Sequence, residues 1–327
     1  LVWMSEGRNK RSIELDLRSR EGAETLKKLV AEADVLCENF QVGTLEKWGL
    51  GADILQEINP ALIIARITAY GQTGPYRHRP GFGRIANAFS GISYLCGEPD
   101  APPASPGTAT LSDYMSGVYA ALGVLVALQS RAKTGSGQIV DVGLYESVFR
   151  ILDELAPAYA YKDFVRERMG AGTVNAVPHS HYPSKDGLWV AIACTNDKIF
   201  NRLAGLMDRN DVTGDGIYGT IAMREAKRAE VDAFVTNWTT GFTRDEILKA
   251  CETAEVPCGP VYSIEEIFND PQYKARENLV EINDPRLGSI TLPNVCPRLT
   301  ETPGQISWAG RALGADTEDV LKDWLGE

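Results

Sequence analysis

Short runs rich in β-branched residues alternate with segments of helical periodicity over the first 150 residues. The strand-like runs are 12–17, 34–40, 60–71 and 138–144, and the helical segments are 20–33, 52–58 and 114–131. Strands separated by helices form βαβ units, whose consecutive strands lie parallel. The sequence therefore predicts an α/β fold with a mostly parallel sheet in this region.

The pattern changes near residue 163. Residues 163–183 have weak periodicity, which is typical of a linker. Further on, a strand-like run at 186–194 is followed by helical segments at 196–207 and 228–254 and by a strand or turn near 256. We expect four parts: a large domain at 1–162, the linker at 163–183, a smaller α+β domain at 184–275, and a segment at 276–327 that returns to the large domain.

Composition argues against several classes of protein. The formal net charge of -11 disfavours a nucleic-acid partner, which needs a basic face. The apolar run 115–128 is short for a membrane span and contains Gly and Ser, so no membrane partner is expected. The six cysteines have neither a CxxC motif nor a paired Cys/His spacing, which predicts no metal and no disulfide framework. The given chain starts at Leu1 without a signal-type charged and apolar lead, so we expect no secretion signal and a cytoplasmic location.

Ligand-binding motifs are sparse. GxGxxG and the P-loop pattern are absent, so neither dinucleotide nor triphosphate binding is indicated. The loop "GQTGPYRHRPGFG" at 71–83 follows a strand, and such loops line the ligand crevice of open α/β sheets. Its arginines, with Arg84 beyond it, are either crevice or surface residues. The basic cluster from Arg8 to Arg11 is typical of surface, and His179 and His181 are more typical of linker or core than of a metal site.

Asp113 stands at the start of the apolar segment "LSDYMSGVYAALGVLVAL". Aspartate is a preferred N-cap residue, and capping is the simplest interpretation. A carboxylate at a helix N-terminus is also stabilised as an anion, and small residues such as Gly117 and Ala120 leave room beside it. Such a carboxylate can attack an activated acyl group. The residues alone leave both roles open.

Five ordered segments resemble those of the class III CoA-transferases, the family of the formyl-CoA:oxalate and carnitine CoA-transferases. The segments are "NKRSIELDLRSREG", "ADVLCENFQVGTLEKWGLG", "INPALIIARITAYGQTGPY", "SDYMSGVYAALGVLVAL" and "RAKTGSGQIVDVGLYES". The resemblance is dense over residues 8–150 and looser over 178–310. It implies a Rossmann-like large domain, a small domain, and two chains interlocked as a homodimer.

The resemblance also implies a reaction. The family's catalytic aspartate falls on Asp113, which would form a covalent aspartyl intermediate while CoA moves from an acyl-CoA donor, such as succinyl-CoA, to a small carboxylic acid. The CoA thioester is a substrate, and no separate cofactor is implied. The acceptor's second carboxylate is expected to face Arg84 and the histidines at 179 and 181.

The resemblance also implies which residues of this chain contact CoA. The residues that the resemblance places on CoA are Leu15, Arg18, Asn39, Phe40, Lys47 and Trp48. Arg18 and Lys47 would supply positive charge for its phosphates.

The chain departs from the family pattern in three places. The family's first strand–helix unit does not precede "NKRS" here, a glycine-run active-site loop is absent, and Gly83 stands where many relatives have an acidic residue. Two alternatives remain. A 2-methylacyl-CoA racemase would have histidine at Phe82 and aspartate at Gly83, and phenylalanine cannot accept a proton. The other alternative is a non-catalytic CoA-binding subunit of a hetero-oligomer.

Overall fold

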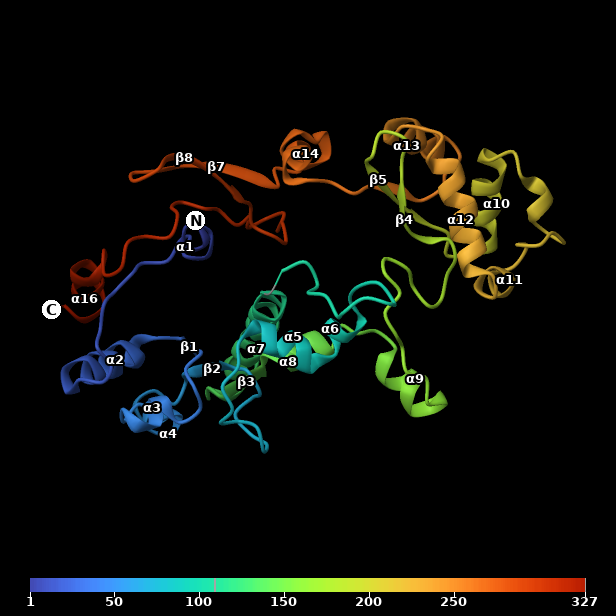
Figure 1. Cartoon of the computed structure of the whole chain (residues 1–327). Helices are drawn as coiled ribbons and strands as arrows, with labels where there is room; N and C mark the ends of the chain where they lie inside the picture. The colour runs from blue at the N-terminus through green and yellow to red at the C-terminus, as the bar shows by residue number, and fades with distance from the viewer. Residues whose placement is uncertain (109, 327) are drawn as a thin grey trace. The chain divides into compact units, whose positions relative to one another are not determined.

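The computed structural model describes residues 1–108 and 110–326 (Figure 1). The chain forms two compact units. The large unit comprises residues 1–96, 103–166 and the chain from Lys274 onward, and the small unit comprises residues 97–102 and 167–273. Two crossings near residues 166 and 273, and the short excursion at 97–102, therefore connect the units.

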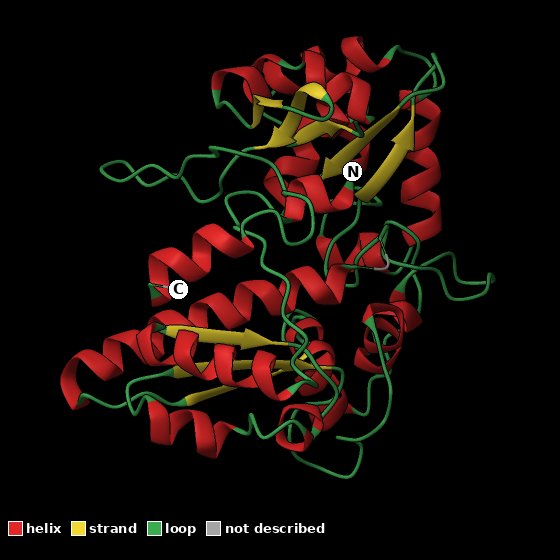
Figure 2. Ribbon diagram, turned by 90° about the vertical axis from the view of Figure 1, so that its left-hand side faces the viewer, coloured by secondary structure: helices red, strands yellow, loops and turns green. Residues whose placement is uncertain are grey.

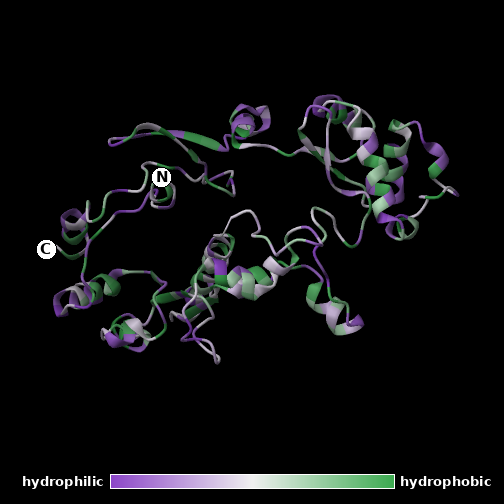
Figure 3. Cartoon of the chain, in the orientation of Figure 1, coloured by the Kyte–Doolittle hydropathy of each residue, from purple (hydrophilic) through white to green (hydrophobic). Residues whose placement is uncertain are grey.

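A three-stranded parallel sheet forms the centre of the large unit. Its strands are β1 (Val35–Glu38), β2 (Ile63–Thr68) and β3 (Ile139–Gly143), in the order β1-β2-β3. The central strand β2 is apolar over most of its length (Figure 3), and most of its residues are buried. The prediction of an α/β fold with a parallel sheet is confirmed.

Helices α7 (Leu111–Thr134) and α8 (Leu144–Phe149) pack against strands of this sheet (Figure 2). The other helices of the large unit are α1 (Val2–Glu6), α2 (Arg20–Glu32), α3 (Thr44–Lys47), α4 (Ala52–Ile58), α5 (Gly83–Ser90), α6 (Ile92–Leu95), α9 (Leu155–Lys162) and α16 (Thr317–Leu325). The Ser19 side chain caps α2 by accepting the Gly22 N–H at 3.0 Å. Val30 of α2 packs into a core with Leu55 and Ile64. That core holds α2 and α4 to the sheet.

Helix α7 is longer than its apolar run suggested. It has 24 residues and ends at Gly135, whose φ of +75° is the left-handed conformation that glycine adopts readily. The polar residues after Leu128 favour helix, so the helix continues to Thr134. By length and composition alone, α7 is therefore long and apolar enough to cross a membrane, although the apolar run 115–128 was expected to be too short for one. Within the large unit it packs against β2, β3, α5 and α8.

Residues 12–17 do not form the predicted strand. The backbone N–H of Ser12 donates to Asp316 Oδ2 at 2.8 Å, and the N–H of Glu14 donates to Thr317 Oγ1 at 3.0 Å. The Asp316 N–H donates in return to the Ser12 carbonyl at 2.8 Å. This segment is anchored by the start of α16 instead of by a neighbouring strand. The remaining strands of the large unit, β7 (Leu279–Asp284) and β8 (Gly288–Pro293), form an antiparallel hairpin.

The small unit has an antiparallel sheet covered by helices. Its strands are β4 (His179–Pro183), β5 (Trp189–Ala193) and β6 (Cys258–Pro260), in the order β4-β5-β6. Its helices are α10 (Asp197–Leu206), the 3-10 turn η1 (Asn210–Val212), α11 (Ile221–Glu225), α12 (Arg228–Thr239), α13 (Arg244–Thr253) and α14 (Ile264–Asn269), and α15 (Pro271–Ala275) follows at the return crossing. Fully buried Phe200, Val231 and Ile247 lie at the centre of its core.

Two details of the small unit differ from the sequence-based interpretation. Strand β4 lies inside the segment interpreted as a linker. Because β4 is an edge strand, its sequence "HSHYP" is more polar than the sequence patterns that predict a strand. The segment 228–254 forms two helices instead of one. The break falls at Gly241, and Thr243 then begins α13 with a capping box to Glu246.

Candidate active site

Asp113 lies in the first turn of α7 but does not cap it. The helix begins at Leu111 with Thr110 in the N-cap position, and no side chain makes the capping hydrogen bond. The capping interpretation is therefore wrong, because the helix starts two residues before Asp113. The carboxylate is still near the positive end of the helix dipole. Its side chain is left available for another role.

Two buried serines hold the start of α7 in place. Ser112 donates from Oγ to the Gly83 carbonyl at 3.0 Å, and Ser116 donates from Oγ to the Ser112 carbonyl at 2.6 Å. Both serines are fully buried. Since Gly83 is the first residue of α5, this contact joins the starts of the two helices. Gly83 consequently lies beside the residue that precedes Asp113.

The pKa of Asp113 is displaced upward. Partial burial raises the pKa of this carboxyl, and a hydrogen bond from its own backbone N–H only partly offsets the rise. The helix dipole favours the anion, whereas desolvation favours the neutral acid and is the main cause of the raised pKa. A more basic carboxylate is a better nucleophile once it is ionised.

A cavity of about 510 Å³ opens beside Asp113. Its lining residues are Val2, Glu6, Arg8, Thr110, Asp113, Tyr114, Gly117, Val118 and Ala121. A methyl group added to Gly117 would meet no atom within 4 Å, so this glycine leaves space beside the carboxylate, as the sequence suggested. Glu6, Arg8 and Tyr114 are residues that sequence reasoning missed. The only signal was Arg8, within a basic cluster that was interpreted as surface.

Asn39 and Phe40 line a second cavity, of about 310 Å³, beyond the carboxyl ends of β1 and β2. Its other lining residues are Gln41, Val42, Thr68, Ala69, Arg77, Arg79, Pro80, Gly81 and Phe82. The loop 71–83 therefore lines the crevice, and two of its three candidate arginines are crevice residues. Arg79 also stacks on the Tyr76 ring, with its guanidinium carbon 3.7 Å from the ring centroid.

A network of ion pairs around buried Arg66 holds the backbone in place at this crevice. Arg66 Nε lies 2.6 Å from Glu38 Oε1, and Arg66 Nη1 lies 2.8 Å from Glu46 Oε1. Glu38 Oε2 also accepts the backbone N–H of Phe40 at 2.7 Å. Burial acts to raise the pKa of Glu46, but hydrogen bonds from Arg66 and the backbone outweigh it and lower that pKa. The network ties β1, β2 and α3 together.

Of the other residues expected to contact CoA, only some lie near Asn39 and Phe40. Trp48 makes an edge-to-face contact with Phe40, with ring centroids 5.3 Å apart, and Lys47 is exposed at the end of α3. Leu15 is half-buried. Arg18 is exposed and pairs with Asp16 at 2.8 Å. Phe40 and Trp48 are thus brought together with Asn39, whereas Arg18 makes its ion pair locally.

The histidines belong to the small unit. His179 and His181 lie on β4, and His181 lines a cavity of about 550 Å³ together with Tyr182 and Asp232. Tyr182 Oη donates to Asp232 Oδ1 at 2.6 Å. Among the residues that the structure describes, no group of three or more His, Cys, Asp and Glu side chains is arranged to hold a metal ion.

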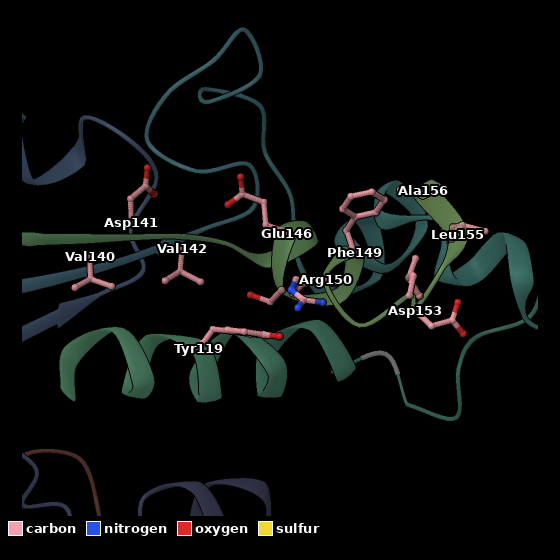
Figure 4. Close-up of a pocket in the computed structure, with 12 residues that line it drawn as sticks. Tyr119, Val140, Asp141, Val142, Glu146, Phe149, Arg150, Asp153, Leu155 and Ala156 are labelled. Atoms are coloured by element: carbon pink, nitrogen blue, oxygen red, sulfur yellow. The ribbon is translucent and has the colours of Figure 1, made fainter. Parts of the chain in front are cut away.

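A larger cavity of about 600 Å³ lies between α7, β3, α8 and the start of α9, without Asp113 in its lining. Tyr119 of α7 points toward Arg150 there, below the side chains of Val140 and Val142 from β3 (Figure 4). Most of its lining surface is apolar. Phe149, which lines this cavity, is exposed.

Comparison with known proteins assigns the chain to a family. The model of CoA-transferase family III matches residues 1–317. The succinyl-CoA–L-malate CoA-transferase of Chloroflexus aurantiacus is similar in both its subunits. Its alpha subunit is 50% identical over 99% of this chain and 76% of its own length, and its beta subunit is 51% identical over 100% of this chain and 81% of its own length.

A solved structure agrees with this assignment. The crystal structure of a CAIB/BAIF family protein from Brucella suis superposes with a TM-score of 0.85 at 34% identity, over 98% of this chain and 83% of that one. These matches define an enzyme of the CoA-transferase class. The chain belongs to CoA-transferase family III.

Proposed function

We propose that this enzyme moves CoA from succinyl-CoA to a small dicarboxylic acid through covalent intermediates on Asp113. The observation that carries the proposal is the position of Asp113, in the first turn of α7 beside a cavity that Gly117 keeps open. The two Chloroflexus subunits, whose name specifies succinyl-CoA and L-malate, support the choice of donor and of acceptor class.

The chemistry divides one difficult exchange into four steps. Asp113 attacks the thioester carbonyl, the C–S bond breaks, and a mixed anhydride and CoA thiolate form. The thiolate attacks the Asp113 acyl carbon, which gives an aspartyl-CoA thioester and releases succinate. The acceptor carboxylate attacks that thioester and forms a second anhydride while thiolate leaves again. The thiolate then attacks the acceptor's acyl carbon, which yields the new CoA ester and restores the Asp113 carboxylate.

CoA is proposed to occupy the crevice beside Asn39 and Phe40. Arg77 and Arg79 line this crevice and supply the positive charge that its phosphates need. The Phe40–Trp48 pair provides an aromatic surface for the adenine. Leu15, Arg18 and Lys47 remain proposed contacts along the nucleotide.

Arg8 is the proposed partner of the second carboxylate of the acceptor. It lines the cavity of Asp113, and its guanidinium donates from Nη1 to the Pro293 carbonyl at 2.5 Å. It forms no ion pair with any acidic group that the structure describes. Its remaining N–H groups suit a carboxylate. This assignment replaces the one that placed Arg84 and the β4 histidines there.

The active enzyme is proposed to be an interlocked homodimer. Support comes from α7, where Val118, Leu122, Leu125 and Val126 are each more than half exposed although all are apolar. Exposed apolar patches of this kind mark protein interfaces. The Chloroflexus relative has two similar subunits, so a second chain related to this one is the alternative partner.

Substitution of Asp113 by Asn tests the proposal. The variant keeps the shape of the side chain and loses the nucleophile, so transfer from succinyl-CoA falls to background. Hydroxylamine trapping followed by peptide mass spectrometry of the wild type is expected to mark Asp113 as the acylated residue. Asp319→Asn, an exposed position on α16, is the matched control. Retained turnover in Asp113→Asn contradicts the proposed function.

A further inference from the structure

Glu6 and Tyr114 form a hydrogen-bonded pair at the edge of the Asp113 cavity. Tyr114 Oη donates to Glu6 Oε1 at 2.9 Å, across a separation of 108 residues. Glu6 is the last residue of α1, and Tyr114 directly follows Asp113 in α7. Both side chains line the cavity that contains Asp113 and Arg8. The proposed mechanism uses neither of them.

We propose that this pair binds a hydroxyl group of the acceptor, so that the acceptor is a short hydroxylated dicarboxylic acid. The inference rests on the proposed function and adds the chemical group that the site selects. Glu6 determines this specificity, and Tyr114 is a positioning residue that holds the Glu6 carboxylate in place.

The pair presents acceptors of hydrogen bonds and no spare donor. An ionised carboxylate has two oxygens and only accepts, and the O–H of Tyr114 already donates to Oε1. Glu6 Oε2 accepts no hydrogen bond from the residues that the structure describes, and Glu6 is in no ion pair with them. Glu6 is half-buried, so water can reach this oxygen, and a ligand that displaces the water must supply a donor in its place. A carboxylic acid substrate supplies such a donor only through a hydroxyl or an ammonium group.

Charge in the cavity favours the hydroxyl of a dianion. Positive charge on Arg8 opposes the rise in the Tyr114 pKa that the Glu6 hydrogen bond causes, so Arg8 is close to the pair. Arg8 attracts a carboxylate, while Glu6 and Asp113 repel one. A dicarboxylate thus has one carboxylate at Arg8 and the other at the reacting centre. The carbon chain between them carries the group that meets Glu6.

An acid without this hydroxyl is rejected for a physical reason. When it binds, it removes water from Glu6 Oε2 and returns no hydrogen bond. An unpaired charged group costs about 1.5–3 kcal/mol, which corresponds to roughly a 10- to 100-fold loss in kcat/KM. Sites built to hydrogen-bond a hydroxyl discriminate strongly against the analogue that lacks it.

The test compares two acceptors that differ by one hydroxyl. The full-length, assembled enzyme is given succinyl-CoA and one of two acceptors, malate or isotope-labelled succinate, and kcat/KM is measured for each. The malate enantiomer is the one that the wild type uses better. In Glu6→Leu the ratio of malate to succinate is expected to fall about 10- to 100-fold. In Tyr114→Phe it is expected to fall by less, because the carboxylate remains. Glu57→Leu, exposed on α4, is the control.

The outcomes separate this inference from the proposed function. Acylation of Asp113 by succinyl-CoA alone is measured in parallel and needs no acceptor. If Asp113 is acylated in both the wild type and Glu6→Leu, and the malate-to-succinate ratio of kcat/KM is the same in the two proteins, Glu6 does not select the hydroxyl. The inference then fails while the proposed function stands. A wild-type preference for succinate or for L-aspartate over malate also overturns it. If wild-type Asp113 is never acylated, the proposed function itself fails.

Discussion

Ser112 donates a hydrogen bond to the Gly83 carbonyl at 3.0 Å, and through it the first turn of α7 is held against the first turn of α5. The contact is completely buried on the serine side. Asp113 is the next residue, so the position of the proposed nucleophile depends on this bond. The backbone carbonyl of Gly83 supplies the anchor.

Ser112→Ala is predicted to destabilise the enzyme and slow it. The substitution removes the buried hydrogen bond that joins the starts of α7 and α5, which lowers the free energy of unfolding by about 0.5–1.5 kcal/mol. Asp113 becomes less well positioned, and kcat falls. Urea denaturation and steady-state kinetics measure the two effects. Ser116→Ala is the control, because its hydroxyl bonds within α7 to the Ser112 carbonyl, which the helix also satisfies. Equal losses of kcat in both variants would contradict the prediction.

Arg66→Met is predicted to be strongly destabilising. It leaves the Glu38 carboxylate, whose side chain is 3% exposed, without a counter-charge. Breaking a buried ion pair in this way costs about 3–5 kcal/mol. Glu38 also accepts the backbone N–H of Phe40, so the loss of Arg66 displaces Phe40 at the proposed CoA crevice. The KM for the acyl-CoA donor therefore rises. Glu46→Gln provides the comparison, since its side chain is 42% exposed and its loss costs about 0–1 kcal/mol. Similar unfolding free energies for the two variants would show that the network is not structural.

Substitutions at Gly117 are predicted to separate stability from activity. A Cβ at this helical position meets open space, so Gly117→Ala raises the free energy of unfolding by about 0.5–1 kcal/mol through helix propensity. Gly117→Leu fills space beside Asp113 and lowers kcat/KM for succinyl-CoA while the protein stays folded. Thermal melts with parallel kinetics check both statements. A Leu variant with unchanged kcat/KM would place the substrate elsewhere.

The Arg244–Glu266 pair of the small unit is predicted to make the free energy of unfolding depend on pH in the acidic range. The hydrogen bond from Arg244 is the main cause that lowers the pKa of Glu266 from 4.5 to about 2. Since the folded-state pKa is depressed, the stabilisation is fully present above the unfolded value and is lost as the pH falls toward 2. The difference in unfolding free energy between wild type and Glu266→Gln therefore shrinks over this window.

Denaturation over a series of pH values measures that difference. Glu265→Gln, an exposed neighbour on α14, serves as the matched control. A wild-type advantage that persists undiminished down to pH 2 would assign it to packing instead of charge.

Much of the local structure follows from short-range rules. The apolar β-branched run at β2, the Ser19 and Thr243 caps, and the left-handed Gly135 after α7 are each determined by residues within a few positions of one another. These rules also have limits. Residues 12–17 have the composition of a strand but no neighbouring strand, because Asp316 and Thr317 take their N–H groups.

The sequence by itself thus determined the parallel α/β core, the long helix after Asp113 and, through five ordered segments, the family. Tertiary structure decided the composition of the site. Glu6 and Arg8 reach the Asp113 cavity from more than 100 residues away, and Tyr114 makes its hydrogen bond there. Tertiary structure also decided that burial raises the pKa of Asp113. Periodicity and propensity act over a few residues, whereas cavities and desolvation arise only when distant segments pack together.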